Sequence, residues 1–350
     1  MNYYIGLDAH SSTCTAVVVD EKGEQKLRET FDTTEANLIR FVSSLPEGKT
    51  SLTYEESTLS QWLYLTLIEQ VDHLLVCNPV YVAKKQGAKT DYRDALHLAQ
   101  ELRTGHLKPV FHEKSHWIEL RVLTNNYLAL VDDIVRAKNR LKVVFRAEVV
   151  DTTTPKFYED KVRAKDLKNP NSRFAAEALY DQISSLEKLK TEYRERFQSN
   201  LKKYQPVRNL TSVPGIDLIR ASIITAVVCT PNRFKNKHQF WGYCMLVRHI
   251  QISGGKIYGN KRVHGRKELR DIFLGTAESA MRTETSLRNH YDAARAKGLS
   301  HKEAKIALAR KIASLCLCLL KNNDTFKNDF DVQQTERAKI RKELNLEKHV

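Results

Sequence analysis

The sequence predicts an α/β domain, then a helical middle region, then a mostly α-helical C-terminal part. Three observations support this prediction. Short runs rich in β-branched residues alternate with amphipathic runs up to about residue 110. Apolar residues then recur in heptads, and beyond residue 204 the segments become short and are divided by Pro and Gly. At 350 residues the chain is long enough to bury two cores.

The predicted elements of the first domain, residues 1–110, follow a defined order. Three β-rich runs lie at residues 3–8, 14–20 and 26–33, and the turn signal EKGE precedes the third. A helical run, a strand, a second helical run, a short strand and a helix beginning at Asp91 complete the domain. The order β-β-β-α-β-α-β-α is that of the ribonuclease-H-like fold.

The middle region, residues 111–204, predicts two long amphipathic helices. One runs from His112 to Arg146 and the other from Phe174 to Tyr204, with the polar segment KNPNS before the second. The first helix has two heptad series: Leu120, Tyr127, Ile134 and Leu141, and Leu123, Leu130, Ala137 and Val144. This coiled-coil pattern predicts a helical hairpin or a dimerising arm, and ordinary helices packed on a core are an alternative.

The C-terminal part, residues 205–321, begins with the segment VRNLTSVPGIDLIRASIITAV, which is typical of a helix-hairpin-helix. In such a motif the turn VPGI exposes backbone N–H groups that can hold a DNA phosphate. A plain helix-loop-helix without a ligand is the alternative. The charged tail, residues 322–350, has little apolar content and is expected to be mobile or weakly helical.

Composition limits the class of protein. The formal net charge of +15 favours a polyanionic partner, because cations that neutralise phosphates release counterions. The six cysteines form no CxxC pair and indicate a reducing compartment. The N-terminus has no signal-peptide pattern, and the longest apolar stretch, near IASLCLCLL, is too short to span a bilayer. We therefore expect a cytoplasmic, prokaryotic protein that acts at the nucleoid and is not membrane-bound.

Four carboxylates lie where one metal site would need them. Asp8 ends the first predicted strand, Glu56 follows the fourth, and Asp91 and Asp94 lie three apart on a helix. In a ribonuclease-H-like sheet the first strand is central and the fourth lies beside it. Carboxylate oxygens suit Mg²⁺, and paired ions can stabilise an in-line displacement at phosphorus. We predict that all four residues bind Mg²⁺ or Mn²⁺ and are catalytic.

The choice of Glu56 over Glu55 depends on strand register. Alternation from Leu52 through Tyr54 to Glu56 favours Glu56 as the inward residue. Taken singly, each acid has a simpler interpretation: a strand end, a solvated side chain, or a helix cap in the case of Asp91. The metal site is inferred from their joint placement.

Basic residues surround the acidic pair and also follow a serine in the second half. Such cations can hold backbone phosphates, although a solvated loop is the alternative interpretation. Ser253 lies in QISGGKIYGNKRVHGRKELR, where a glycine-rich loop would allow close approach of a ligand. The predicted nucleic-acid-binding residues are Lys84, Lys85, Lys89, Arg93, Lys256, Lys261, Arg262, Arg266, Lys267 and Arg270.

The motifs IGLDAHSST, YEEST and KTDYRDALHLAQELRTGHL, followed by LTSVPGIDLIRASIITAV, PNRF, the SGG block and GRKELRDIFLGTA, occur in this order along the chain. The sequence thereby resembles the DEDD transposases of bacterial insertion sequences (the IS110 family), relatives of the Piv-type DNA invertases. Glu56, Ser57 and Thr58 stand where the family has Glu-Ala-Thr. The resemblance covers nearly the whole chain apart from the coiled-coil middle and the tail.

The resemblance implies a RuvC-like catalytic domain and a C-terminal transposase domain. It implies that Ser253 is a nucleophile that forms a phosphoserine link to DNA, completed by metal-bound carboxylates of the first domain. It also implies donor and target DNA and a structured non-coding guide (bridge) RNA. The heptads and the need to act on four DNA strands favour a homodimer that becomes a tetramer on DNA. One departure is that the segment before Ser253, WGYCMLVRHIQISGG, lacks the family's Gly-Leu-x-Pro turn.

Other functions fit the sequence less well. A junction-resolving RuvC-like endonuclease would share the fold and carboxylates but use metal-activated water. The opening IGLDAHSSTCTAVVVD is similar to the first phosphate loop of sugar kinases and actin-like ATPases, yet no second Asp-x-Gly-Gly loop follows. A non-enzymatic nucleic-acid scaffold would make the four acids a coincidence.

Overall fold

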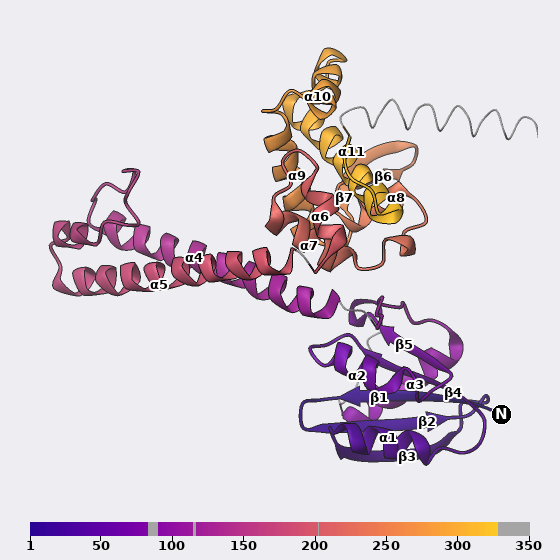
Figure 1. Cartoon of the computed structure of the whole chain (residues 1–350). Helices are drawn as coiled ribbons and strands as arrows, with labels where there is room; N and C mark the ends of the chain where they lie inside the picture. The colour runs from indigo at the N-terminus through magenta and orange to yellow at the C-terminus, as the bar shows by residue number, and fades with distance from the viewer. Residues whose placement is uncertain (83–89, 115–116, 202, 328–350) are drawn as a thin grey trace, which may run out of the picture. The chain divides into compact units, whose positions relative to one another are not determined.

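The computed structural model describes residues 1–82, 90–114, 117–201 and 203–327 (Figure 1). The chain divides into two compact units, Met1–Ser115 and His116–Val350. Each unit is described by itself below.

The first unit contains a five-stranded sheet in the order β3-β2-β1-β4-β5. The strands are β1 (Asn2–Ala9), β2 (Thr13–Val19), β3 (Gln25–Asp32), β4 (Lys49–Glu55) and β5 (His73–Cys77). β1, β2 and β3 pair antiparallel, while β4 runs parallel to both β1 and β5. The predicted order of eight elements is confirmed for this mixed α/β unit, with β1 central and β4 beside it.

The two faces of the sheet are covered by different helices. α1 (Glu35–Ser43) and α2 (Ser60–Leu67) share a core with the β1 and β4 side chains of one face. α3 (Asp91–Thr104) packs on the other face, where Ala95 and Ala99 contact Val17 and Val19 of β2. A short 3-10 helix, η1 (Pro79–Tyr81), lies between β5 and α3.

Gly6 allows α3 to pack directly on β1. A Cβ atom at Gly6 would lie 2.0 Å from the carbonyl oxygen of Ala95 and 2.5 Å from the amide nitrogen of Ala99. No side chain fits between backbones at this separation. The absence of a side chain at Gly6 therefore sets how close the first turn of α3 lies to the end of β1.

The second unit begins with two long helices, α4 (Trp117–Ala147) and α5 (Pro170–Asn200), which lie side by side (Figure 1). Tyr127 contacts Phe197 edge to face with ring centroids 5.4 Å apart, whereas Phe145, eighteen residues later, contacts Tyr180. The partners on α5 run backwards along the sequence, so the pair is antiparallel. Of the predicted alternatives, the structure forms a helical hairpin within one chain. The dimerising arm stays a prediction.

The polar segment KNPNS contains the start of α5. The Asn169 side chain accepts a hydrogen bond from the amide of Asn171, and Pro170 occupies the first helical position. This is a standard helix start, because Pro at that position has no amide hydrogen to leave unpaired. The helix thus starts four residues earlier than the apolar pattern predicted. At the far end of the hairpin, Phe145, Phe157 and Tyr180 form a separate core with η2 (Lys161–Asp166).

The remaining elements of the second unit form a mostly helical bundle. Its core is shared with the base of the α4–α5 hairpin through residues such as Leu120 and Phe197. The elements are α6 (Gln205–Thr211), α7 (Leu218–Val228), η3 (Pro231–Arg233), α8 (Lys237–Tyr243), β6 (Arg248–Ser253), β7 (Lys256–Arg262), α9 (Lys267–Ala280), α10 (Ser286–Ala296) and α11 (His301–Asn322). The apolar stretch near IASLCLCLL lies in α11, where most of its side chains are buried. Among the described helices, none has both the length and the apolar composition needed to cross a bilayer.

The turn between α6 and α7 is packed against α9. A Cβ at Gly215, whose φ is +84°, would lie 2.9 Å from the carbonyl oxygen of Thr276. The Asp217 side chain caps α7 by accepting a hydrogen bond from the amide of Arg220. The two helices and their turn are present as predicted, but a carboxylate already stands at the helix N-terminus, where a phosphate would be repelled.

Candidate metal centre

Asp8 is positioned by the central strand of the first unit. It lies near the end of β1, where it pairs with Thr15 of β2, and its side chain is 20% exposed. Its neighbour Leu7 faces the α1 and α2 side of the sheet, so alternation along the strand places Asp8 on the α3 face. The sheet therefore presents this carboxylate to the first turn of α3.

Asp91 and Asp94 lie in the first turn of α3. The cap of this helix is Thr90, whose side chain accepts a hydrogen bond from the amide of Arg93. Asp91 is therefore not required as the cap, which was the simpler interpretation of its position. The positive end of the helix stabilises negative charge at both aspartates.

The structure brings Asp8 and Asp91 together with His10, a residue that was not among the candidates chosen from the sequence. The Nε2 atom of His10 lies 3.3 Å from Asp8 Oδ2 and 3.7 Å from Asp91 Oδ1. One ligand atom from each of the three residues lies within 4.8 Å of the others. A sequence signal for His10 existed, because it follows Asp8 by two residues and continues the alternation of β1 on the same side.

Electrostatics at this site favour a cation. Burial raises the pKa of Asp8, and the charges of Asp91 and Asp94 raise it further, whereas His10 lowers it. Removing these carboxylates from water while holding them near one another disfavours their ionised forms. A divalent ion would offset this cost, and hard carboxylate oxygens are its preferred ligands. Asp8 and Asp91, with Asp94 beside them, thus fit a divalent metal ion.

Glu56 is positioned by the end of β4 and contacts His112. It follows the last residue of β4, and its amide donates a 2.9 Å hydrogen bond to the carbonyl oxygen of Cys77. Its Oε2 atom lies 3.2 Å from Nε2 of His112, whose side chain is only 5% exposed. Within the described residues, Glu56 is not part of the group formed by Asp8, His10 and Asp91. Its role as a metal ligand stays a prediction.

The register between β1 and β4 fixes the face of Tyr54, two residues before Glu56. Leu7 pairs with Tyr54 in the parallel ladder, and both side chains are buried against α1 and α2. That face is opposite to the α3 face that carries Asp8. Glu56 itself follows the last residue of β4, so alternation along the strand does not fix its direction, and the choice of Glu56 over Glu55 stays a prediction.

Ser253 lies at the tip of a β-hairpin. It is the last residue of β6, and the turn consists of Gly254 and Gly255, with φ angles of +53° and +75°. A two-residue turn with both φ angles positive matches the twist of a hairpin and favours Gly at both positions. The glycines beside Ser253 do form a turn, but the residues that flank it form two strands, which were not predicted from the sequence. The signal for the hairpin was Gly-Gly between two runs of β-forming residues.

Cross-strand pairing gathers polar side chains around the serine. Ser253 pairs with Lys256, and His249 pairs with Lys261. Within each pair the two side chains point to the same face of the hairpin, and an irregularity in the ladder between Gln251 and Ile252 separates the two pairs. All four are exposed. The face that carries Ser253 is therefore cationic and open to solvent.

The other predicted nucleic-acid-binding residues differ in their surroundings. Arg93 is exposed in the first turn of α3, and Arg262 ends β7 opposite Arg248. Lys267 forms a 2.7 Å ion pair with Asp271 in the next turn of α9, and Arg270 is half-buried. The remaining three, Lys84, Lys85 and Lys89, lie outside the described residues.

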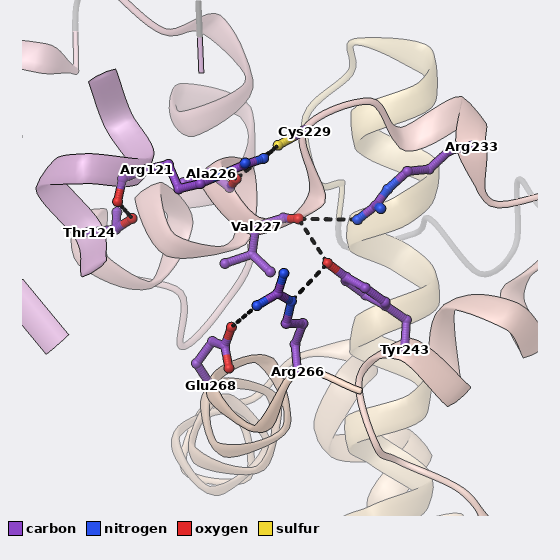
Figure 2. A network of polar contacts seen from close by, with 9 residues as sticks. All are labelled: Arg121, Thr124, Ala226, Val227, Cys229, Arg233, Tyr243, Arg266 and Glu268. Carbon is purple, nitrogen blue, oxygen red and sulfur yellow. Dashed lines mark hydrogen bonds and ion pairs between the residues drawn. The ribbon is translucent and has the colours of Figure 1, made fainter. Parts of the chain in front are cut away.

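Arg266 belongs to a network of polar contacts around the C-terminal end of α7 (Figure 2). The last carbonyl groups of a helix have no partner within it. Here Ala226 accepts from Arg121 Nε at 3.4 Å, while Val227 accepts from Arg233 Nη2 at 3.2 Å and from the Tyr243 hydroxyl at 3.3 Å. Side chains from α4, η3 and α8 thus donate hydrogen bonds to the last carbonyl groups of α7 and join these elements.

Arg266 extends this network to the segment that leaves the hairpin. Its Nε donates to the Tyr243 hydroxyl at 3.3 Å, and its amide donates to the Tyr243 carbonyl oxygen at 2.7 Å. The connection from β7 to α9 is therefore fixed to the end of α8. These contacts give Arg266 a role in positioning the base of the serine-bearing hairpin, in addition to any contact with phosphate.

Comparison with known proteins identifies the family. Residues 5–148 match the DEDD transposase family described as "Transposase", and residues 207–292 match "Transposase IS116/IS110/IS902 family". The "Insertion element IS116 uncharacterized 44.8 kDa protein" of Streptomyces clavuligerus is 23% identical, over 95% of this chain and 98% of that protein. The "Insertion element IS110 uncharacterized 43.6 kDa protein" of Streptomyces coelicolor is 26% identical over 120 residues, which are 34% of this chain and 30% of that protein.

The two family matches include both the carboxylates of the first unit and the serine-bearing hairpin of the second. The chain therefore belongs to the IS110 family of transposases.

Proposed function

We propose that this protein is a DNA recombinase that excises and inserts its own element by metal-dependent strand exchange. The observation that carries the proposal is the convergence of Asp8 and Asp91 from different elements on one face of the sheet, with Asp94 beside them. We infer a ribonuclease-H-like, RuvC-like fold for the first unit from its strand order and directions.

The proposed chemistry is phosphoryl transfer through Ser253. Its Oγ forms a bond to a DNA phosphorus while the bond from that phosphorus to a DNA oxygen breaks, and the serine proton leaves as the departing oxygen gains one. A hydroxyl of the other strand then attacks the phosphoserine, which releases the serine and rejoins DNA. Asp8, Asp91 and Asp94, with Glu56 as the predicted fourth ligand, would hold Mg²⁺ or Mn²⁺, which supplies charge neutralisation at the phosphate.

The exposed cations near Ser253 would bind the backbone of the scissile strand. Lys256 lies opposite Ser253 in the ladder and would contact phosphates beside the attacked one, with Lys261 farther along the same hairpin. The net charge of +15 suits a large polyanion. We further propose a structured guide RNA that pairs with donor and target DNA, and an assembly that is a dimer and becomes a tetramer on DNA.

A covalent protein–DNA adduct tests the nucleophile. The purified protein is incubated with Mn²⁺, guide RNA and end-labelled DNA carrying the element's junction, then denatured and separated by electrophoresis. We expect a labelled adduct in the unmodified protein and none in Ser253→Ala. Ser185→Ala, at an exposed serine of α5, is the matched control and should retain the adduct. An adduct in Ser253→Ala would refute the assignment.

The same experiment separates the proposal from the junction-resolving endonuclease. An enzyme of that kind attacks with water, so it would cut the DNA without an adduct and would keep cutting after Ser253→Ala. Asp8→Asn should abolish cleavage in both cases, because both mechanisms require the metal site.

A further inference from the structure

His10 lies between the two carboxylates that define the metal centre, although it belongs to no predicted ligand set. It is the first residue after β1, in the turn that leads to β2. Its Nε2 atom lies 3.3 Å from Asp8 Oδ2 and 3.7 Å from Asp91 Oδ1. One ring nitrogen thus faces oxygens supplied by two different elements.

The backbone of His10 is held in place on both sides. Its amide donates to the carbonyl oxygen of Thr13 at 2.9 Å, and its own carbonyl accepts from the Thr33 hydroxyl at 2.7 Å. Thr33 in turn donates its amide to the carbonyl oxygen of Ser12 at 2.9 Å. The side chain is exposed, but it projects from a turn that is fixed to the end of β3, so the imidazole is presented to the carboxylates by the fold.

The distances from His10 Nε2 to the two carboxylates are close to those between neighbouring ligand atoms around one ion. In an octahedral site with bonds of about 2.0–2.1 Å, adjacent ligand atoms lie roughly 3 Å apart. The distances from His10 Nε2 to Asp8 and Asp91 are slightly wider, and one ligand atom from each residue lies within 4.8 Å of the others. A slightly larger ion than Mg²⁺, such as Mn²⁺, would need less contraction of this group.

We propose that His10 is a nitrogen ligand of the ion held by Asp8 and Asp91, and that it shifts the preference of the site from Mg²⁺ towards Mn²⁺. Imidazole suits transition metals, whereas Mg²⁺ is bound almost entirely by oxygen. Binding uses the lone pair of Nε2, so the ring proton lies on Nδ1. The inference rests on the proposed metal-dependent function but concerns which atoms hold the metal.

Electron paramagnetic resonance of Mn²⁺ tests the ligand directly, without DNA or activity. The full-length protein is titrated with Mn²⁺, and electron spin-echo modulation is recorded for coupling to a directly bound nitrogen. We expect nitrogen modulation in the unmodified protein and none in His10→Gln. The Mn²⁺ affinity of His10→Gln should fall at least about tenfold, and its Mg²⁺ affinity by a smaller factor.

His106→Gln is the matched control. His106 also lies near a carboxylate, with its Nδ1 atom 3.5 Å from Glu101 Oε2, but at the other end of α3. It should keep the modulation and both affinities, while circular dichroism confirms that each variant is folded. Bound Mn²⁺ without nitrogen modulation, or modulation that persists in His10→Gln, would overturn the role of His10 and leave the carboxylate site standing. A protein that binds no Mn²⁺ at all would overturn the metal centre and this inference together.

Discussion

Gly6→Ala should move the proposed metal ligands on α3 away from Asp8 on the sheet without replacing any ligand. The added Cβ would lie 2.0 Å from the carbonyl oxygen of Ala95, and ordinary contact begins at 3.4 Å. α3 must therefore move away from β1 by about 1.4 Å, because neither backbone can rotate out of the way. Asp91 and Asp94, in the first turn of that helix, would move with it and away from Asp8.

The expected cost follows from overpacking a tight core. Such insertions typically destabilise a protein by about 1–3 kcal/mol. For a unit of this size each kcal/mol corresponds to roughly 4 °C in melting temperature, so we expect a fall of about 4–12 °C. The carboxylate of Asp91 would also move away from Asp8 and His10, whose ligand atoms now lie within 4.8 Å of it. The affinity for a metal ion should therefore fall.

Thermal unfolding with and without Mn²⁺ measures both effects. The unmodified protein should gain stability when Mn²⁺ is added, since a ligand that binds only the folded state raises its melting temperature. Gly6→Ala should melt earlier and lose most of this gain. Gly242→Ala is the control, because a Cβ there meets nothing within 4 Å. A Gly6→Ala protein with unchanged melting and unchanged Mn²⁺ response would refute the packing argument.

Three further predictions concern individual side chains. Burial and the neighbouring aspartates raise the pKa of Asp8. The folded protein therefore binds the carboxyl proton of Asp8 more tightly than the unfolded chain does. The stability of the folded protein falls as the pH rises from the ordinary carboxyl pKa through the raised pKa. Asp8→Asn should therefore stabilise the metal-free protein at pH 7 and flatten its pH profile above the ordinary carboxyl pKa, as measured by thermal unfolding in a chelator. Phe145→Ala, at the core of the α4–α5 hairpin, should cost about 3–5 kcal/mol in denaturant unfolding, whereas the exposed Val143→Ala should cost less than about 0.5 kcal/mol. Replacing Lys256 and Lys261 by Ala should reduce the salt dependence of DNA affinity by about one unit of log–log slope for each phosphate that the variant no longer neutralises, as measured by fluorescence anisotropy; an unchanged slope would place DNA on another face.

Local patterns predicted most of the secondary structure. The strand runs before residue 110 and the two amphipathic helices depend on residue periodicity, and the start of α3 depends on a capping threonine next to the acidic pair. Such signals lie within a few residues of one another along the chain. The β6–β7 hairpin was equally local but was missed, because the Gly-Gly turn was interpreted as a loop.

The sequence by itself determined which acids stand at strand and helix ends, and that the chain belongs with basic, DNA-acting proteins. Only the tertiary structure decided which of them meet. Glu56, at the end of β4, lies beside His112, and the missing side chain at Gly6 let α3 carry Asp91 to Asp8 and His10. The physical reason is that strand pairing decides on which face of the sheet a carboxylate lies, and the paired residues are dozens of positions apart in the sequence. A shift of one residue in that pairing turns every side chain of the strand to the opposite face.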